Sequence, residues 1–177
     1  MTTPLKAVAA GGNSAELREW VAGDFLPVAN GGTGGTTQAA ARAGLGLGSS
    51  AVAAILGTVA QSGGVPTGAI MQSGSNANGE FVRLADGRQI CTQKFTLSSQ
   101  AIAAGGLSTG YDWTYPAAFI DKPNMSYSAT GSFSYAFTIG AEVVNAAQTP
   151  SIYARNSATA TLTTALTLHM TAIGRWF

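Results

Sequence analysis

The sequence predicts a mainly β protein, in which short N-terminal helices and Gly-rich connectors lead to a C-terminal antiparallel β-sandwich-like knob. Three observations support this prediction. Polar and apolar residues alternate through much of the second half, which is the period of half-buried strands. Turn-favouring Gly, Asn and Asp residues separate these alternating runs. Before residue 67 the chain is instead rich in Gly, Ala and Ser, with one amphipathic segment at helical spacing.

The composition indicates that much of the burial comes from other copies of the chain. Only 10% of the 177 residues are charged and 23 are glycine, so few large side chains remain to fill an interior. The net charge of +1 is spread without runs and lacks the electrostatic footprint of a nucleic-acid-binding surface. We therefore expect no nucleic-acid partner.

No segment has the pattern of a membrane span or of a secretory signal. The run from Ala51 to Ala60 has about half of the roughly 20 residues that a spanning helix needs. The apolar patch from Leu5 to Ala10 is too short for the core of a secretory signal. We expect no membrane insertion, and synthesis in the cytoplasm. The single Cys91 excludes an intrachain disulfide and is expected to be a small buried strand residue.

The first segment, residues 1–29, is expected to hold a short amphipathic helix from Asn13 to Asp24. Asn13 and Glu16 have the spacing of a capping box, and an apolar stripe recurs at helical intervals. A helix of about three turns is not stable alone, so its stripe must pack on the rest of the chain or dock on a partner. The residues assigned to attachment are Leu17, Trp20, Val21 and Phe25.

The second segment, residues 30–66, is expected to be a Gly/Ala-rich shaft or linker. The glycines of Asn30–Thr37 permit close approaches that side chains would forbid. A short Ala-rich helix follows from Gln38, breaks into alternating glycines, and leads to a second connector over Gly57–Pro66. A phosphate-binding loop is excluded, because its motif needs a lysine and none lies between Lys6 and Lys94.

The third segment, residues 67–177, is expected to be β. A strand begins at Gly68, Ser73–Gly79 forms a loop, and a strand over Glu80–Leu84 leads to a hairpin turn at Asp86-Gly87. The returning strand from Arg88 alternates, without indicating which of its faces is buried.

Two further runs also alternate. In the C-terminal run, Leu and Met residues form the core face and Thr residues the other, with Thr164 as the polar exception. Aromatic residues alternate with Ser and Thr from Met125 to Thr138, which indicates a compact sandwich.

Motifs spread over most of Asn30 to Phe177 resemble those of tail fibres of tailed bacteriophages. They are NGGTGGTT followed by ARAGLGLG, the cassette GAIMQSGSNANG at Gly68–Gly79 with ADGRQIC at Ala85–Cys91, WTYPAAF at Trp113–Phe119, and the terminal AIGRWF. The resemblance implies an elongated homotrimer in the virion, made in the host cytoplasm. The three segments of this chain would then be an attachment segment for baseplate or tail-tip proteins (1–29), a trimeric shaft or linker (30–66) and a receptor-binding domain (67–177). Contractile bacteriocins could use the same part.

A tail fibre's receptor is expected to be a bacterial surface polysaccharide or an outer-membrane molecule, held by multivalent adhesion. Aromatic rings suit the CH-rich faces of sugars, and Tyr, Asp and Asn groups bond sugar hydroxyls. Loop positions are favoured over strand interiors, although core packing is the alternative for each aromatic residue. The proposed contacts are Tyr111, Asp112, Trp113, Asp121, Lys122, Asn124, Asn145 and Tyr153. By its motif, Trp113 also fits the framework, as do Arg175 and Trp176.

Catalysis is not expected, and neither is a cofactor or a metal. The only histidine, His169, lies in a Thr-rich strand and fits a half-exposed structural residue better than a base or a metal ligand on a threefold axis. A glycan depolymerase would use a carboxylate pair, but Asp112, Asp121 and Glu142 share no motif. A purely structural baseplate or fibre connector is the stronger alternative to a receptor-binding protein.

Overall fold

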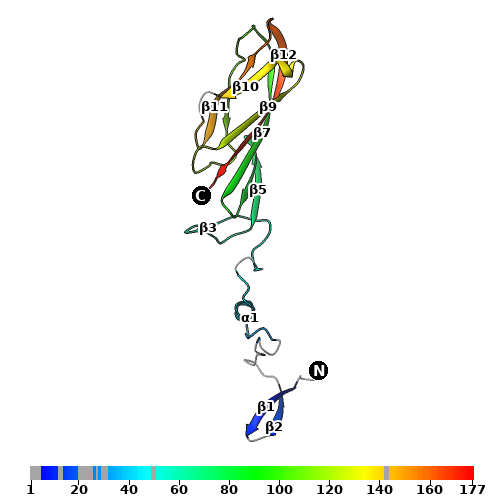
Figure 1. Cartoon of the computed structure of the whole chain (residues 1–177), viewed down its shortest axis with the longest axis vertical. Helices are drawn as coiled ribbons and strands as arrows, with labels where there is room; N and C mark the ends of the chain where they lie inside the picture. Colours follow the sequence, from blue (N-terminus) through cyan, green and yellow to red (C-terminus); the bar gives the residue numbers. More distant parts are fainter. Residues whose placement is uncertain are drawn as a thin grey trace. The chain divides into compact units, whose positions relative to one another are not determined.

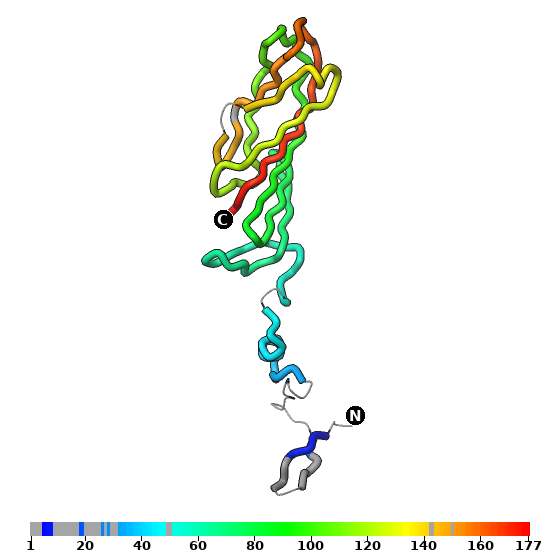
Figure 2. The backbone as a smooth tube through the Cα atoms, viewed as in Figure 1, coloured from blue at the N-terminus to red at the C-terminus, as the bar shows by residue number. Residues whose placement is uncertain are grey.

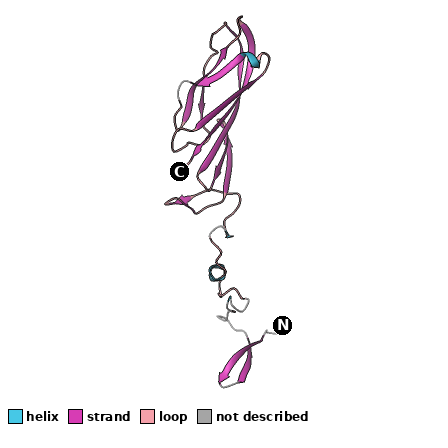
Figure 3. Ribbon diagram, in the orientation of Figure 1, coloured by secondary structure: helices cyan, strands magenta, loops and turns pink. Residues whose placement is uncertain are grey.

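The computed structural model describes residues 5–11, 14–19, 26, 28, 32–48, 51–141 and 144–177. The chain divides into two compact units, Met1–Val52 and Ala53–Phe177. Figures 1 and 2 show the course of the chain, and Figure 3 shows that most of its regular structure is strand. The mainly β fold class is therefore confirmed. No helix among the described residues is long and apolar enough to cross a bilayer.

The first unit contains a β-hairpin where a helix was expected. Strands β1 (Leu5–Gly11) and β2 (Ser14–Glu19) pair antiparallel, with Leu5 opposite Glu19. The helix prediction over Asn13–Asp24 is therefore wrong for the residues in β2. Gly11-Gly12-Asn13 is a turn-favouring sequence, and the cross-strand ladder satisfies backbone groups that a short isolated helix could hold only weakly. Of the attachment residues, Leu17 lies in β2, whereas Trp20, Val21 and Phe25 lie outside the described residues.

The Ala-rich helix of the first unit is confirmed as α1 (Gln38–Gly44). Thr37 caps it, because its hydroxyl accepts a hydrogen bond from the Ala40 N–H at 3.1 Å. The glycines allow close backbone approach, as expected: a Cβ at Gly44 would clash with the Thr33 carbonyl, and one at Gly35 would clash with Ala40. These approaches are made within one chain.

The second unit begins with a small hairpin inside the segment that was expected to be a connector. Strands β3 (Gln61–Ser62) and β4 (Val65–Pro66) flank Gly63 and Gly64, which both have positive φ values. Two consecutive positive φ values are typical of a type I′ hairpin turn, and glycine adopts them without strain.

Two antiparallel sheets form the rest of this unit. The five-stranded sheet has the order β5-β6-β7-β12-β9. Its strands are β5 (Met71–Asn76), β6 (Gly79–Leu84), β7 (Arg88–Ile102), β9 (Asn124–Thr130) and β12 (Leu162–Arg175). The three-stranded sheet has the order β10-β11-β8 and contains β8 (Tyr111–Thr114), β10 (Phe137–Ala141) and β11 (Gln148–Asn156).

The sheets enclose one core, which confirms the sandwich. Trp113, Ile152 and Ala154 come from the small sheet, and Cys91, Leu97, Leu166, Leu168, Met170 and Ala172 from the large one. The buried face of β7 is thus the one that carries Cys91. Thr164, the polar exception in β12, is buried with its hydroxyl 3.0 Å from the Ser132 carbonyl oxygen, so its hydrogen-bonding capacity is satisfied.

One local prediction in this unit is wrong. Ser73–Gly79 is not a loop, because β5 continues to Asn76 and only Ala77 and Asn78 form the turn. The alternating run from Met125 to Thr138, which indicated a sandwich, is divided between the two sheets. It breaks after Thr130 into a turn and a short 3₁₀ helix, η3 (Ser134–Ala136), before β10 begins. Gly131 has a φ of +131° and marks the break, a conformation that an L side chain rarely adopts.

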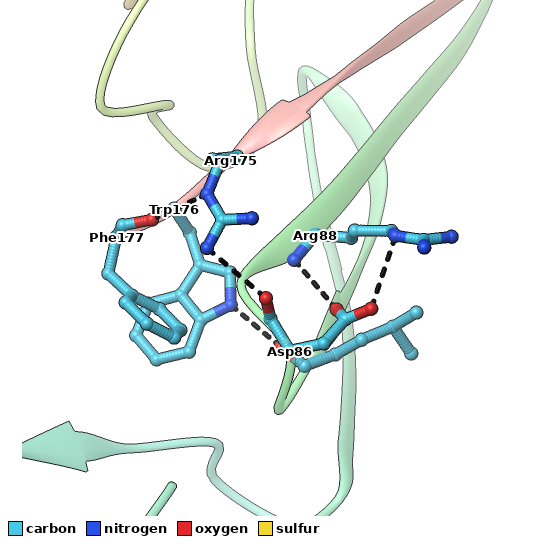
Figure 4. Close-up of polar contacts among 6 residues, drawn as sticks. Asp86, Arg88, Arg175, Trp176 and Phe177 are labelled. Atoms are coloured by element: carbon cyan, nitrogen blue, oxygen red, sulfur yellow. Dashed lines mark hydrogen bonds and ion pairs between the residues drawn. The ribbon is translucent and has the colours of Figure 1, made fainter. Parts of the chain in front are cut away.

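The C-terminal residues fasten the hairpin turn at Asp86-Gly87, which is confirmed between β6 and β7 (Figure 4). The Trp176 indole donates a hydrogen bond to the Leu84 carbonyl at 2.9 Å, and the Arg175 guanidinium donates to the Asp86 carbonyl at 3.2 Å. Asp86 also forms an ion pair with Arg88 at 3.1 Å. Arg175 and Trp176 are therefore framework residues, as their motif suggested.

Candidate receptor-binding surface

Strand β11 sends alternate side chains to the two faces of the small sheet. Ile152, Ala154 and Asn156 are fully buried on the inner face, whereas Arg155 is exposed and Tyr153 is half-buried. Since successive side chains of a strand point to opposite faces, Tyr153 and Arg155 lie on the outer face.

A β-bulge sets this orientation. Thr149 pairs with Trp113 and Ile152 pairs with Tyr111, so two residues of β11 stand opposite the single residue Asp112. A one-residue shift moves every later side chain to the other face of a sheet. The bulge therefore turns Ile152 inward and Tyr153 outward.

Asp112 stabilises the bulge. Ser151 has a φ of +55°, which is unusual for a residue other than glycine. Its backbone N–H donates a hydrogen bond to the Asp112 carboxylate at 2.8 Å, and a charged acceptor makes such a bond strong. The structure thus gives Asp112, a predicted receptor contact, a positioning role in the sheet.

Two shallow hollows adjoin on the outer face. The first has a volume of about 500 Å³ and is lined by Leu107, Thr138, Gly140, Ala141, Tyr153 and Arg155. The second, of about 370 Å³, is lined by Gly105, Thr138, Arg155, Asn156, Ser157 and Ala158. Thr138 and Arg155 line both hollows and are cross-strand partners. We call the two together the Arg155 groove.

The groove combines an apolar wall with one cation. Leu107 and Tyr153 supply apolar surface, and a Cβ at Gly110 would lie only 2.7 Å from the Tyr153 ring, so glycine there leaves room for the ring. Among the described residues, no acidic side chain lines either hollow and none pairs with Arg155. The guanidinium, with its five N–H donors, is available to an acceptor from outside.

The structure places Trp113 in the core, which corrects its assignment as a contact residue. Its side chain is fully buried, and its indole N–H donates to the Asn78 carbonyl at 2.9 Å. Tyr115 meets it edge-on, with ring centroids 5.1 Å apart. A buried, hydrogen-bonded indole serves packing and cannot reach a receptor.

Tyr111 is half-buried and largely committed to internal contacts. Its ring stacks on Phe95 with centroids 3.7 Å apart, and its hydroxyl donates to the Gln93 amide oxygen at 2.9 Å. Burial raises the pKa of this hydroxyl above its usual value, against the smaller effect of the Gln93 bond. The Tyr111 side chain therefore serves mainly to pack β8 against β7, and little of it is available to a receptor.

The other predicted contacts lie away from the groove. Asn124 pairs with Ile173 near the end of β12, and Ile120, next to Asp121 and Lys122, bonds the Arg175 carbonyl. Asp121, Lys122 and Asn124 are exposed there. Asn145 turns its own loop, because its side-chain oxygen accepts hydrogen bonds from the backbone N–H groups of Ala147 and Gln148. Of the predicted contacts, only Tyr153 lines the groove.

Arg155 is the main residue that sequence reasoning missed. Its signal was the alternation of Ile152-Tyr153-Ala154-Arg155-Asn156, in which Tyr and Arg share one face. A bulge lies between Thr149 and Ile152. Alternation counted from the buried Thr149 would therefore place Tyr153 and Arg155 on the buried face.

The groups considered for catalysis remain scattered. His169 is half-buried on the large sheet, with Nε2 3.1 Å from the Thr130 hydroxyl. Asp112 is bonded in the bulge, Asp121 accepts a hydrogen bond from the Lys122 N–H, and Glu142 lies outside the described residues. In the described parts of the chain, no group of three or more His, Cys, Asp or Glu side chains is placed to hold a metal.

Comparison with known proteins gives structural likeness only. No protein-family model matches the sequence, and a search of curated proteins finds no similar sequence. An R1 pyocin fibre of P. aeruginosa, comprising C-terminal residues 323–701, aligns over 85% of this chain with 18% identity and a TM-score of 0.52. An N-truncated R1-type pyocin tail fibre aligns over 80% of this chain and 98% of its own length, with 16% identity and a TM-score of 0.50.

The chain spans about a third, 35%, of the length of the first of these structures. At such identities the likeness concerns the fold, and it agrees with the tail-fibre motifs in the sequence. The chain therefore shares the fold of R1 pyocin tail fibres.

Proposed function

We propose that this protein is a tail-fibre component of a phage or a phage-tail-like particle, and that its second unit binds a receptor on the bacterial surface. The observation that carries the proposal is the shared fold with pyocin tail fibres, together with motifs of the tail-fibre type. The first unit then attaches to baseplate or tail-tip proteins. The protein acts by adhesion, without catalysis.

A surface glycan is the proposed receptor class. The Arg155 groove is shallow, carries a tyrosine beside polar groups, and lies on a sheet whose other face is well packed. Such a site gives a weak single contact. Several copies per particle raise the overall avidity through effective concentration, so a weak site is sufficient.

We propose a homotrimer as the assembled form. An apolar row crosses the outer face of the large sheet, because Val82 pairs with Ile90 and Ile90 pairs with Ile173. Ile90 and Ile173 are 36% and 45% exposed in the single chain. Burying such a row against other copies removes apolar area from water and stabilises the assembly.

The test is binding of the fluorescently labelled full-length protein to a panel of bacterial strains, with particle mass measured by light scattering on the same sample. Strain-selective binding by a trimer is the expected result. A folded trimer that binds no strain would favour a purely structural fibre or baseplate connector. Shortening of purified surface polysaccharide by the protein would instead favour a depolymerase.

A further inference from the structure

We propose that the Arg155 groove binds an acidic sugar. The Arg155 guanidinium binds the carboxylate or phosphate of the sugar, and the sugar ring packs on Leu107 and Tyr153. The inference rests on the proposed adhesive function and adds a chemical class and a location for the receptor. It begins from charge: Arg155 is an exposed cation without an ionic partner among the described residues.

The orientation of the groove residues is built into the backbone. The bulge opposite Asp112 turns Tyr153 and Arg155 outward, and it keeps Ser151 at a positive φ value. Bulges are over-represented beside functional sites, where they re-aim side chains. Strain at an isolated residue persists where the surrounding structure holds it, and here the Asp112 bond does so.

The groove also has the composition that a sugar needs. Leu107 is 57% exposed and borders the same hollow as the Tyr153 ring, which gives a sugar face an apolar support. Thr138 lines both hollows and Ser157 lines the second, and their hydroxyl oxygens lie 3.3 Å apart. Hydroxyl groups both donate and accept, as sugar hydroxyls require.

The charge makes the ligand acidic. An arginine forks two N–H donors toward a carboxylate or a phosphate, and a charge-assisted bond is about twice as strong as a neutral one. Because Arg155 lines both hollows, a chain of two acidic sugars can place one unit in each hollow with the cation between them. A disaccharide should therefore bind more tightly than a monosaccharide.

The experiment compares matched sugars on the full-length protein by saturation-transfer NMR and titration. Galacturonate and galactose differ in one carboxylate, and mannose 6-phosphate against mannose distinguishes phosphate from carboxylate. We expect an acidic sugar of one or both pairs to bind about tenfold more tightly than its neutral partner, and digalacturonate to bind more tightly than galacturonate.

Substitutions in the Arg155 groove test whether the sugar binds there. Arg155→Gln should weaken binding of the acidic sugar about tenfold and remove its preference over the neutral sugar. Tyr153→Ala should weaken the acidic and the neutral sugar alike. Gly110→Ala should weaken binding by displacing the Tyr153 ring, while Arg155 stays in place. Lys94→Gln is the matched control, since it removes an exposed cation of β7, in the other sheet, and should change nothing.

The inference is overturned if the wild-type protein binds none of the acidic sugars, if acidic and neutral sugars bind equally, or if Arg155→Gln binds as the wild type does. Cell binding measured in parallel separates this from the adhesive function. If wild type and Arg155→Gln bind the same strains equally well, adhesion stands and the Arg155 site is wrong. If wild type binds acidic sugars but no strain, the site stands and the adhesive function is wrong.

Discussion

The hydroxyl groups of Tyr115 and Tyr127 are both buried, and within the described part of the chain only that of Tyr115 makes a hydrogen bond. The Tyr115 hydroxyl pairs with the Thr149 hydroxyl, which also lies 3.7 Å from the Met125 sulfur. Among the described residues no group has the geometry to satisfy the Tyr127 hydroxyl, although the Thr149 hydroxyl lies close enough to lower its pKa slightly against the effect of burial. Burial raises the pKa of both phenols above the usual value, with a further rise at Tyr127 from the neighbouring Tyr115.

We expect opposite effects when these hydroxyls are removed. Tyr127→Phe should raise the free energy of unfolding by about 1 kcal/mol, because it removes an unsatisfied polar group. Tyr115→Phe should lower it by about 1 kcal/mol, because the buried hydrogen bond between the Tyr115 and Thr149 hydroxyls is lost. Urea unfolding at one fixed protein concentration measures both changes. A destabilised Tyr127→Phe variant would show that this hydroxyl has a partner in solution.

Cys91 and the buried tyrosines make stability depend on pH on the alkaline side. Burial raises the pKa of the Cys91 thiol above its ordinary 9.0, outweighing the lowering by its contacts with Ala117, Gln89 and Arg83. The folded state then holds the proton longer than the unfolded state does. Stability is therefore complete below the unfolded pKa and falls as pH rises from it toward the folded pKa.

The unfolding midpoint should accordingly fall as pH increases above about 9. In Cys91→Ala the onset of this fall should move toward the titration of the phenols, whose ordinary pKa is 10.0. Thermal unfolding at a series of pH values measures the slope of the midpoint against pH. Loss of packing around the missing sulfur lowers the midpoint at every pH and leaves this slope unchanged. Equal slopes in wild type and Cys91→Ala would exclude the thiol as the cause.

At the scale of the elements, Asn156 joins three segments at one end of the sandwich. Its amide N–H groups donate to the carbonyl oxygens of Ile102, Ala103 and Ala160 at 2.8, 3.2 and 2.9 Å. Its side-chain oxygen accepts from the Ala158 N–H at 2.9 Å. One buried amide thus connects the end of β7 with the chain between β11 and β12.

Asn156→Ala should lower the free energy of unfolding by more than about 2 kcal/mol, since several buried carbonyls lose a donor. Asn156→Asp should be worse, because a buried carboxylate would face those same carbonyls. Ser157→Ala, at the exposed neighbouring position, is the control and should stay within about 0.5 kcal/mol of wild type. Chemical denaturation measures all three, and a mild effect of Asn156→Ala would contradict the bridging role.

The elements also show what the sequence could predict. The core face of β12 and the turn at Asp86-Gly87 followed from alternation and turn chemistry, which are local. The β1–β2 hairpin was missed because Leu17, Trp20 and Val21 have helical spacing. The strand form of β2 depends instead on its pairing with β1, which the spacing within one segment does not reveal. The groove was missed because it depends on a bulge, and the residue count on one strand does not reveal the count on its partner.

At the scale of the whole molecule, the apolar row over Val82, Ile90 and Ile173 predicts how the chain assembles. Ile90→Lys or Ile173→Lys should convert the proposed trimer into monomers, because burying a charge in an apolar contact between copies would be costly. Ala101→Lys is the matched control, since it adds the same charge to an exposed position of β7 near its other end. Light scattering gives the mass, and a trimer that survives both Ile changes would exclude this row from the interface.

The position of β12 in the large sheet has a consequence for synthesis. This strand follows β7 and β9 in the sequence, yet it lies between them and pairs with both. Until β12 has been synthesised, β7 and β9 each expose an unpaired edge, which is a template for aggregation. A premature stop before residue 162 would remove the middle of the sheet, so only translation products that include β12 can complete the fold.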